Sequence, residues 1–156
     1  MDSVEQARRS LHQVLGEIDW ADHSNTPAAR YRIDLGPPQE PVSDLVIGID
    51  AATRMLLFLA NFAPAVADAN REGVMRYLNE ANWNLMLGNF EMNDESGAVR
   101  YRSTLPFGRG ELDPVAIRGA ILGAMQVVEA HAGAIAAAIA GSGALSWSFQ
   151  EGRLHG

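Results

Sequence analysis

Two residue types are missing from this chain of 156 residues: cysteine and lysine. Without cysteine there can be no disulfide scaffold, no thiol nucleophile and no zinc site built on thiolates. All 12 basic residues are arginine, which excludes Schiff-base catalysis and a Walker-type phosphate loop, because both use a lysine amine. The formal net charge is -7 at pH 7, and an acidic balance argues against a general nucleic-acid binder.

Long apolar runs are scarce, and one segment needs a membrane test. Residues 119–142 carry a single charged side chain, Glu129, and are long enough to cross a bilayer. Gln126, Glu129 and His131 place their polar groups in the middle of that segment, where lipid makes them costly. We therefore expect a helix buried against protein and no membrane span. Residues 1–9 show no apolar signal region, so a cytoplasmic protein is expected.

The composition that remains is typical of one soluble domain, with 47% hydrophobic and 20% charged residues. There are no internal repeats and no dividing linker. We expect a single domain over residues 1–143 and a C-terminal tail over residues 144–156, in which Leu145, Trp147 and Phe149 alternate with small or polar residues.

The hydrophobic periodicity predicts the order α-β-β-β-α-β-β-α. Ser3 and Gln6 suggest a capping box at the first helix, and Asp113 followed by Pro114 is typical of the start of the last one. Short connections between strands favour antiparallel pairing. The predicted fold class is α+β, an antiparallel sheet with the helices mainly on one face. The expected elements are helices near 3–18, 65–83 and 114–141, and strands near 30–35, 44–50, 54–62, 86–93 and 99–104.

The third predicted strand is apolar on both faces, which is typical of a central strand that is covered twice. Leu56, Phe58 and Phe62 point one way, and Met55, Leu57 and Leu59 point the other. Helices of one chain readily cover one face only, so one set is a candidate partner-binding surface. The last helix adds small residues at four-residue spacing, namely Gly119, Gly123, Gly133, Ala137 and Gly141. We expect a homodimer whose interface is partly sheet face or last helix.

Two pairs of arginines are further candidates for partner binding. Arg30 with Arg32, and Arg100 with Arg102, have i, i+2 spacing, so each pair lies on one face of its strand. Arginine there can bind an acidic peptide or a phosphate by bidentate contacts. The alternative is a solvated sheet face balanced by acids such as Glu91, since exposed ion pairs are common and weak.

Catalytic constellations are sparse. The histidines lack a partner arrangement that general acid–base chemistry requires. Asp19, Asp22 and His23 are the only clustered set of nitrogen and oxygen ligands, and their spacing matches no metal motif. We therefore assign no catalytic residue, no metal site and no cofactor.

The second helix and the hairpin carry a family resemblance. Residues 78–84 read LNEANWN, residues 88–93 read GNFEMN, and residues 97–102 read GAVRYR before Leu105 and Pro106. This asparagine-rich helix end, Gly-x-Phe strand, acidic turn and Val-x-aromatic return strand resemble the YbjN family of bacterial proteins. The resemblance implies a fold like that of type III secretion chaperones, which are small, acidic, cytoplasmic homodimers that hold segments of partner proteins. It implies no catalytic residues.

The resulting hypothesis is a non-catalytic protein that binds another, unidentified protein, in a chaperone-like or regulatory role. The alternative is a sensor of a small ligand, a lipid or an anionic metabolite, or an enzyme, using a pocket between the helices and the sheet. A closed apolar pocket with converging polar groups would favour the alternative, whereas a continuous apolar surface would favour the first hypothesis.

Overall fold

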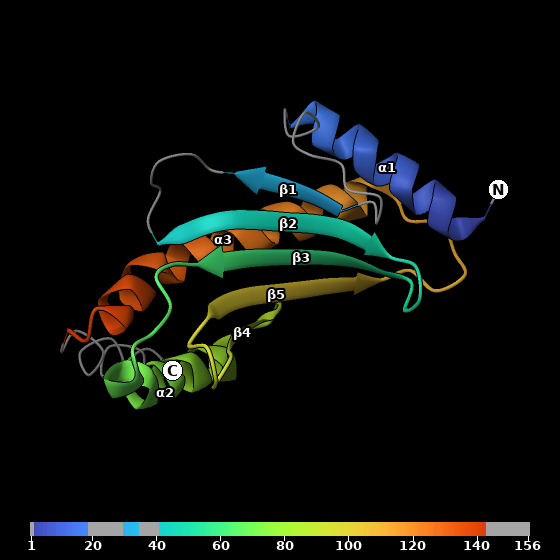
Figure 1. Ribbon diagram of the computed structural model, residues 1–156. Helices are drawn as coiled ribbons and strands as arrows, with labels where there is room; N and C mark the ends of the chain where they lie inside the picture. The colour runs from blue at the N-terminus through green and yellow to red at the C-terminus, as the bar shows by residue number, and fades with distance from the viewer. Residues whose placement is uncertain (1, 19–29, 35–40, 143–156) are drawn as a thin grey trace.

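The strands pair into one antiparallel sheet in the order β1-β2-β3-β5-β4 (Figure 1). The computed structural model describes residues 2–18, 30–34 and 41–142, with the backbone alone at residues 30 and 32–34. The elements are α1 (Ser3–Glu17), β1 (Arg30–Asp34), β2 (Val42–Asp50), β3 (Met55–Phe62), a 3-10 turn (Asp68–Asn70), α2 (Arg71–Asn84), β4 (Asn89–Met92), β5 (Val99–Pro106) and α3 (Pro114–Ile139). The predicted α+β class and element order are confirmed.

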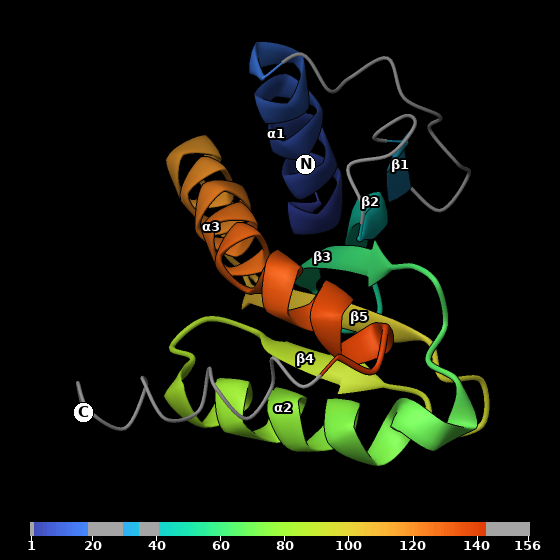
Figure 2. The same cartoon turned by 90° about the vertical axis from the view of Figure 1, so that its left-hand side faces the viewer.

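The helices α1 and α3 lie on one face of the sheet, and α2 lies beside β4 (Figure 2). Alternate residues of the strands point toward them, because successive side chains of a strand face opposite sides. In β3 the even-numbered residues are all buried and the odd-numbered ones are half-buried. The core therefore fills the space between one sheet face and the helices. Its largest fully buried side chains include Tyr101, Leu11, Leu15, Leu45, Ile47, Leu56, Ile117, Ile121 and Ile135.

The N-terminal cap predicted for α3 is observed, and the one predicted for α1 is not. Asp113 caps α3 by accepting a hydrogen bond from the Val115 N–H at 2.8 Å, with Pro114 at the first position, as predicted. The capping box predicted at α1 is wrong. Asp2 is the cap, and the Gln6 amide instead accepts from Leu112 N at 2.8 Å and donates to Leu112 O at 3.2 Å. That long-range pair ties α1 to the segment before α3.

The side chain of Asn82 links helix α2 to the outer edge of β4 by hydrogen bonds. The Asn82 carboxamide accepts from the Phe90 N–H at 2.8 Å and donates to the Phe90 C=O at 3.0 Å. A neighbouring strand would satisfy the same two backbone groups, so Asn82 takes the place of a strand there. Within the asparagine-rich helix end, Asn82 therefore has a structural role, because its side chain bonds backbone groups where the helix meets the strand.

Strands β4 and β5 form a hairpin, and the turn that joins them contains Gly97. Gly97 has a left-handed φ of +74°, a conformation that glycine adopts readily in hairpin turns. Its C=O accepts from the Val66 N–H at 2.8 Å, and its own N–H donates to the Asn93 C=O at 2.8 Å. The hairpin is thereby attached to the loop that leads into α2.

Candidate functional site

The sheet face that points away from the helices is the candidate site, and we call it the open face. Apolar side chains lie at its centre, where Leu57 and Leu59 of β3 are half-buried. The cross-strand register sets Val46 of β2 on one side of Leu59 and Arg102 of β5 on the other. The described side chains that share this face by register are those of Asp44, Val46, Asp50, Met55, Leu57, Leu59, Asn61, Asn89, Glu91, Arg100, Arg102, Thr104 and Pro106.

Two arginines on the open face share one carboxylate. Glu91 of β4 accepts from Arg100 Nε at 2.7 Å and also pairs with the guanidinium of Arg102. Partial burial raises the pKa of Glu91, but its hydrogen bonds to Arg100 and Asn89 and the two arginine charges outweigh that effect, so the net pKa is lowered. The carboxylate is therefore ionised at neutral pH. Two guanidinium groups and one carboxylate leave one positive charge, and both arginines remain about half exposed.

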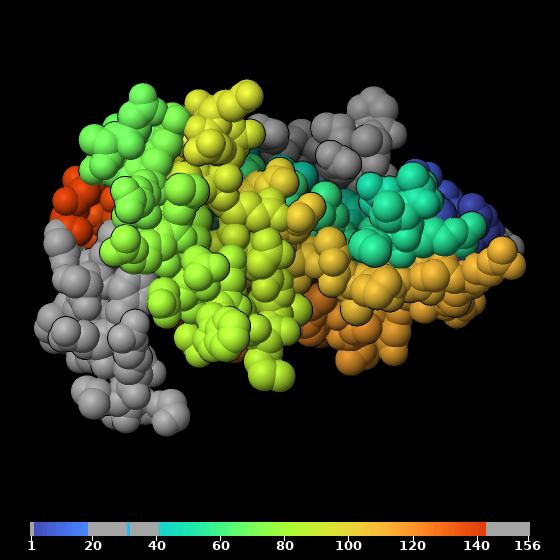
Figure 3. All heavy atoms as spheres, turned by 90° about the horizontal axis from the view of Figure 1, so that it is seen from below, coloured from blue at the N-terminus to red at the C-terminus, as the bar shows by residue number. Residues whose placement is uncertain are grey.

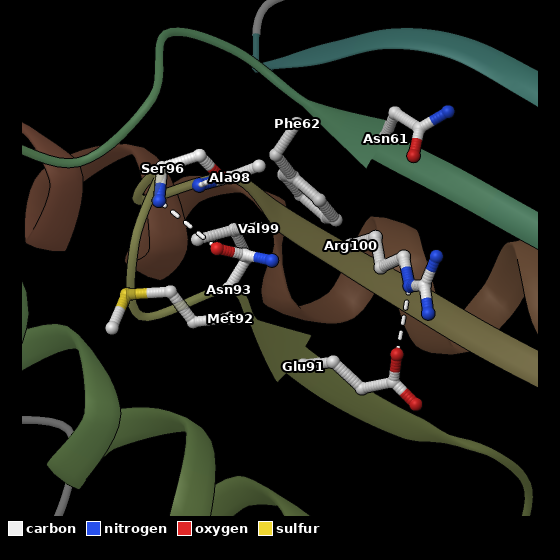
Figure 4. A pocket seen from close by; sticks show the side chains of 9 residues that line it. All are labelled: Asn61, Phe62, Glu91, Met92, Asn93, Ser96, Ala98, Val99 and Arg100. Atoms are coloured by element: carbon white, nitrogen blue, oxygen red, sulfur yellow. Dashed lines mark hydrogen bonds and ion pairs between the residues drawn. The ribbon is translucent and has the colours of Figure 1, made fainter.

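Two hollows on this side of the molecule meet at Arg100. The first, of about 350 Å³, is bounded by the β2–β3 turn, the apolar centre of β3 and the outward side chains of β5. The second, of about 500 Å³, continues past Asn61 and Glu91 to Asn93 and Ser96 of the hairpin turn (Figure 4). Their linings follow β3 and β5 from Met55 to the hairpin turn, and we call the two hollows together the trough. At its hairpin end the second hollow also reaches the core residues Phe62 and Val99. The eight residues of β3 span about 26 Å at the rise of a strand, which sets the length of the trough.

The candidate residues named from the sequence divide into three groups. Arg100 and Arg102 lie together on the open face, as their spacing predicts. Arg30 and Arg32 pair by backbone register with Gly48 and Val46. The third group, Leu56, Phe58 and Phe62, lies in the core at 2%, 3% and 6% exposure. The half-exposed set is therefore its alternative, Met55, Leu57 and Leu59.

One residue of the open face had only a weak signal in the sequence. Glu91 appears there as an acid that balances the sheet arginines, whereas the structure makes it the shared partner of both. The acidic turn, residues 94–97, is the signal that could have found it, because a hairpin closed there pairs Glu91 with Arg100 across the strands. Its reach to Arg102 depends on side-chain rotamers that a pattern does not show.

A second polar cluster lies under α3. His131 Nδ1 is 2.8 Å from the Tyr77 hydroxyl, and its ring lies 5.2 Å from that of Phe90. Burial lowers the pKa of His131 and raises the pKa of Tyr77 to about 12. Both groups are therefore neutral at pH 7, and the cluster joins α2, α3 and β4 as a structural contact.

His131 should make stability depend on pH. Its pKa in the folded state lies below the unfolded value, so the unfolded chain binds the proton more readily. The contribution is complete above about pH 6.5 and is lost as the pH falls through the folded pKa. We expect the melting temperature to fall between pH 7.5 and pH 5, and to fall less in His131→Gln.

A matched variant isolates this effect. His12→Gln changes an exposed histidine that contacts a tyrosine hydroxyl, Tyr31, at 3.0 Å, and it should leave the pH dependence in place. Measurements stop at pH 5 so that the carboxylates remain ionised. An unchanged pH dependence in His131→Gln would contradict the assignment.

The described residues were compared with the patterns of a metal site and of a membrane-spanning helix. Within residues 2–18, 30–34 and 41–142, no three histidine, aspartate or glutamate side chains gather as metal ligands would. The cluster of Asp19, Asp22 and His23 lies outside the described residues, as does the tail over residues 144–156.

One described helix, α3, is long and apolar enough to cross a membrane, a test that core helices of soluble proteins also pass. Of the tested window, 22% is buried in the fold.

The family follows from comparison with known sequences. Residues 43–136 match the model of the YbjN family, which is described as "Putative bacterial sensory transduction regulator". The match covers more than half of the chain, and the chain belongs to the YbjN family. It includes β2 to β5 and most of α3, and therefore the described part of the open face apart from β1. A comparison with curated proteins found no matching sequence.

Solved structures share the fold. The structure entitled "Crystal structure of YbjN, a putative transcription regulator from E. coli" is similar with a TM-score of 0.59 and 14% identity, over 78% of this chain and 85% of that one. The structure entitled "Crystal Structure of the ExsC-ExsE Complex" contains a chain that is similar with a TM-score of 0.61 and 19% identity, over 84% of this chain and 94% of that one. The HopA1-SchA chaperone-effector complex contains a chain that is similar with a TM-score of 0.57 and 12% identity, over 82% of this chain and 94% of that one. At these identities the likeness establishes the fold.

Proposed function

We propose that this protein is a non-catalytic, cytoplasmic binding protein that holds an extended segment of another protein on the open face of its sheet, in a chaperone-like or regulatory role. The observation that carries the proposal is the open face itself. It is an apolar centre flanked by half-exposed arginines, with a trough along the strands. Family membership and the fold shared with chains of chaperone–effector complexes support it.

The shape of the trough favours an extended segment over a folded domain. At about 26 Å it accommodates roughly eight residues of extended chain. Side chains of such a segment alternate between the sheet and solvent, so every second one contacts the open face. Leu57 and Leu59 at its centre fit apolar side chains.

The arginines add a charge preference. Arg100 and Arg102 keep one positive charge beyond Glu91, and guanidinium groups bind carboxylates in a bidentate manner. An acidic side chain of the segment would therefore bind beside the apolar contacts. The preferred segment alternates apolar residues with at least one aspartate or glutamate. We further propose that residues 1–143 act as one domain, which includes the whole family match.

The sharpest test compares the wild type with Leu59→Asp. Leu59 is half-buried beside Arg102, so an aspartate there can pair with that arginine and keep the fold while removing the apolar centre. Affinity capture from the native cell extract, quantified by mass spectrometry, should recover at least tenfold less partner with this variant. Arg102→Gln should weaken binding mainly at low salt, because screening already weakens an exposed charge contact at high salt.

Glu72→Ala is the matched control, because it changes an exposed residue of α2 away from the open face. It should recover partner as the wild type does. Thermal melting of each variant separates lost binding from lost folding. Equal recovery by all folded variants would contradict the proposal. A small anion that co-purifies with the wild type, with no partner protein lost in Leu59→Asp, would favour the alternative of a ligand sensor.

A further inference from the structure

The tail carries the pattern that the open face is expected to prefer. Residues 145–153 read LSWSFQEGR. The positions between its larger side chains are serine, glutamine or glycine, and every second position is occupied by, in order, Leu145, Trp147, Phe149, Glu151 and Arg153. Alternate side chains of an extended chain point to the same side. An extended tail would therefore present three apolar groups, then an acid and then a base, on one side.

Helix α3 ends close to the turn of the β4–β5 hairpin. The Asn70 side chain donates to the Ile139 C=O at the end of α3 at 3.3 Å, and the next residue, Arg71, donates to the Asp94 C=O of the turn at 2.8 Å. Figure 3 shows the end of α3 in red, the start of α2 in green and the turn in yellow next to one another at one end of the molecule. The turn also bounds the second hollow. The chain therefore leaves α3 at the hairpin end of the trough.

The tail is long enough to enter the trough and to follow it. Ser142 is the last described residue, and an extended chain advances about 3.3 Å per residue. Residues 143–146 then cover about 13 Å, which is available to pass the hairpin turn, and residues 147–153 cover about 23 Å. The trough is about 26 Å long, so residues 147–153 fit within it.

The second hollow suits an aromatic side chain. Its volume is about 500 Å³, and the apolar part of its lining comes from Phe62, Met92 and Val99 (Figure 4). Trp147 is the first aromatic residue of the tail to arrive there from the hairpin end. Phe149 follows about 7 Å further along an extended chain, where it meets the apolar centre of the open face.

The charges of the tail follow the same order as the charges of the trough. Arg102 shares the one positive charge that Glu91 leaves on the open face, and Asp50 lies at the far end of the first hollow. Glu151 comes beside Arg102 once the aromatic residues are in place. Arg153 follows about 7 Å further on, toward Asp50. The acid of the tail thus meets an arginine, and its base meets a carboxylate.

We propose that residues 147–153 of this chain occupy the trough as an extended segment, and that a partner segment must displace them in order to bind. This inference rests on the proposed function of the open face. A tethered segment acts at an effective concentration on the order of millimolar, so the tail controls access to the site even when its own affinity is modest. Only a segment that binds the open face more tightly than the tail is then held.

Photocrosslinking tests the placement of the tail. Phe149 is replaced in the full chain by p-benzoylphenylalanine, which keeps an aromatic side chain, and the crosslinked residues are identified by mass spectrometry. The crosslinks should fall within the same chain on residues 55–61 and 99–104. The same replacement of Ser148 is the matched control, and it should crosslink to the sheet at least fivefold less, because successive residues of an extended segment face opposite sides. Crosslinks to α3, or between two chains, would overturn the proposal.

Peptide binding tests the competition. The probe is a fluorescent peptide with the sequence of residues 144–153, and its affinity is measured by fluorescence anisotropy. Full-length Trp147→Ser, whose tail is released, should bind the peptide at least tenfold more tightly than the wild type does. Ser148→Ala should bind it like the wild type, and Leu59→Asp combined with Trp147→Ser should lose the gain. Equal binding to the wild type and Trp147→Ser, or binding to neither, would overturn the proposal.

Failure of this inference can be distinguished from failure of the proposed function. If Leu59→Asp loses the captured partner but position 149 does not crosslink to the sheet, the proposed function stands and the docking of the tail is overturned. If position 149 crosslinks to the sheet but Leu59→Asp recovers the partner in full, the tail occupies the trough and the proposed function is contradicted.

Discussion

Gly97→Ala should lower the free energy of unfolding by about 3 kcal/mol. A residue with a Cβ pays about 1–2 kcal/mol in the left-handed conformation, and Gly97 has a φ of +74°. The new Cβ would also lie 2.2 Å from the Val66 carbonyl oxygen, so the loop or the turn must move. That movement breaks the hydrogen bond from Val66 N to Gly97 O, worth about 1 kcal/mol. The melting temperature should fall by roughly 10 °C.

Gly108→Ala separates the two causes. Gly108 also has a left-handed φ, +57°, but a Cβ there would meet no atom within 4 Å. Gly108→Ala should therefore lower the free energy of unfolding only by the cost of the left-handed conformation, about 1 kcal/mol. Chemical denaturation of both variants measures the difference. Equal losses would show that the close approach between Gly97 and Val66 contributes nothing.

Asn82→Ala should lower the free energy of unfolding by about 2 kcal/mol. Two partly buried hydrogen bonds to the Phe90 backbone are lost, each worth about 1 kcal/mol. In the described part of the chain, no other strand lies on that edge of β4 to replace them. The unsatisfied edge is also a template for pairing with another chain. We therefore expect slow aggregation at concentrations where the wild type stays soluble.

Asn84→Ala is the control within the same asparagine-rich segment. Its amide donates to the Glu80 C=O at 3.2 Å on an exposed helix surface, so the change should cost less than about 0.5 kcal/mol. Urea denaturation followed by circular dichroism measures both variants. If Asn82→Ala unfolded like the wild type yet no longer bound its partner, the residue would be part of a recognition site and the structural assignment would be wrong.

The strand pattern made the sheet predictable. Alternation in β5 and the two-sided apolar character of β3 identified an antiparallel sheet with β3 at its interior, and both are observed. The periodicity did not say which apolar face of β3 would be covered, since both sets of residues are apolar. Packing of α3 against β3, and of α1 against β2, covers the face that carries Leu56 and Phe58 and made that choice.

Local capping signals were less informative than long-range contacts. Ser3 and Gln6 have the spacing of a capping box, but Gln6 gains two hydrogen bonds with Leu112, more than 100 positions away. Helix α2 begins at Arg71, after a 3-10 turn, and not directly after Pro64. The Asn70 side chain is there held near the end of α3 by a bond to the Ile139 C=O at 3.3 Å.

By itself the sequence determined the order of the elements, the antiparallel pairing and the family, because these depend on residue spacing and on short connections. Tertiary structure alone decided that Leu57 and Leu59 remain on the open face and that Glu91 holds both arginines. Those outcomes depend on which helix lies against which surface. Several apolar faces of similar hydrophobicity compete for the helices, and the packing of the whole core selects among them.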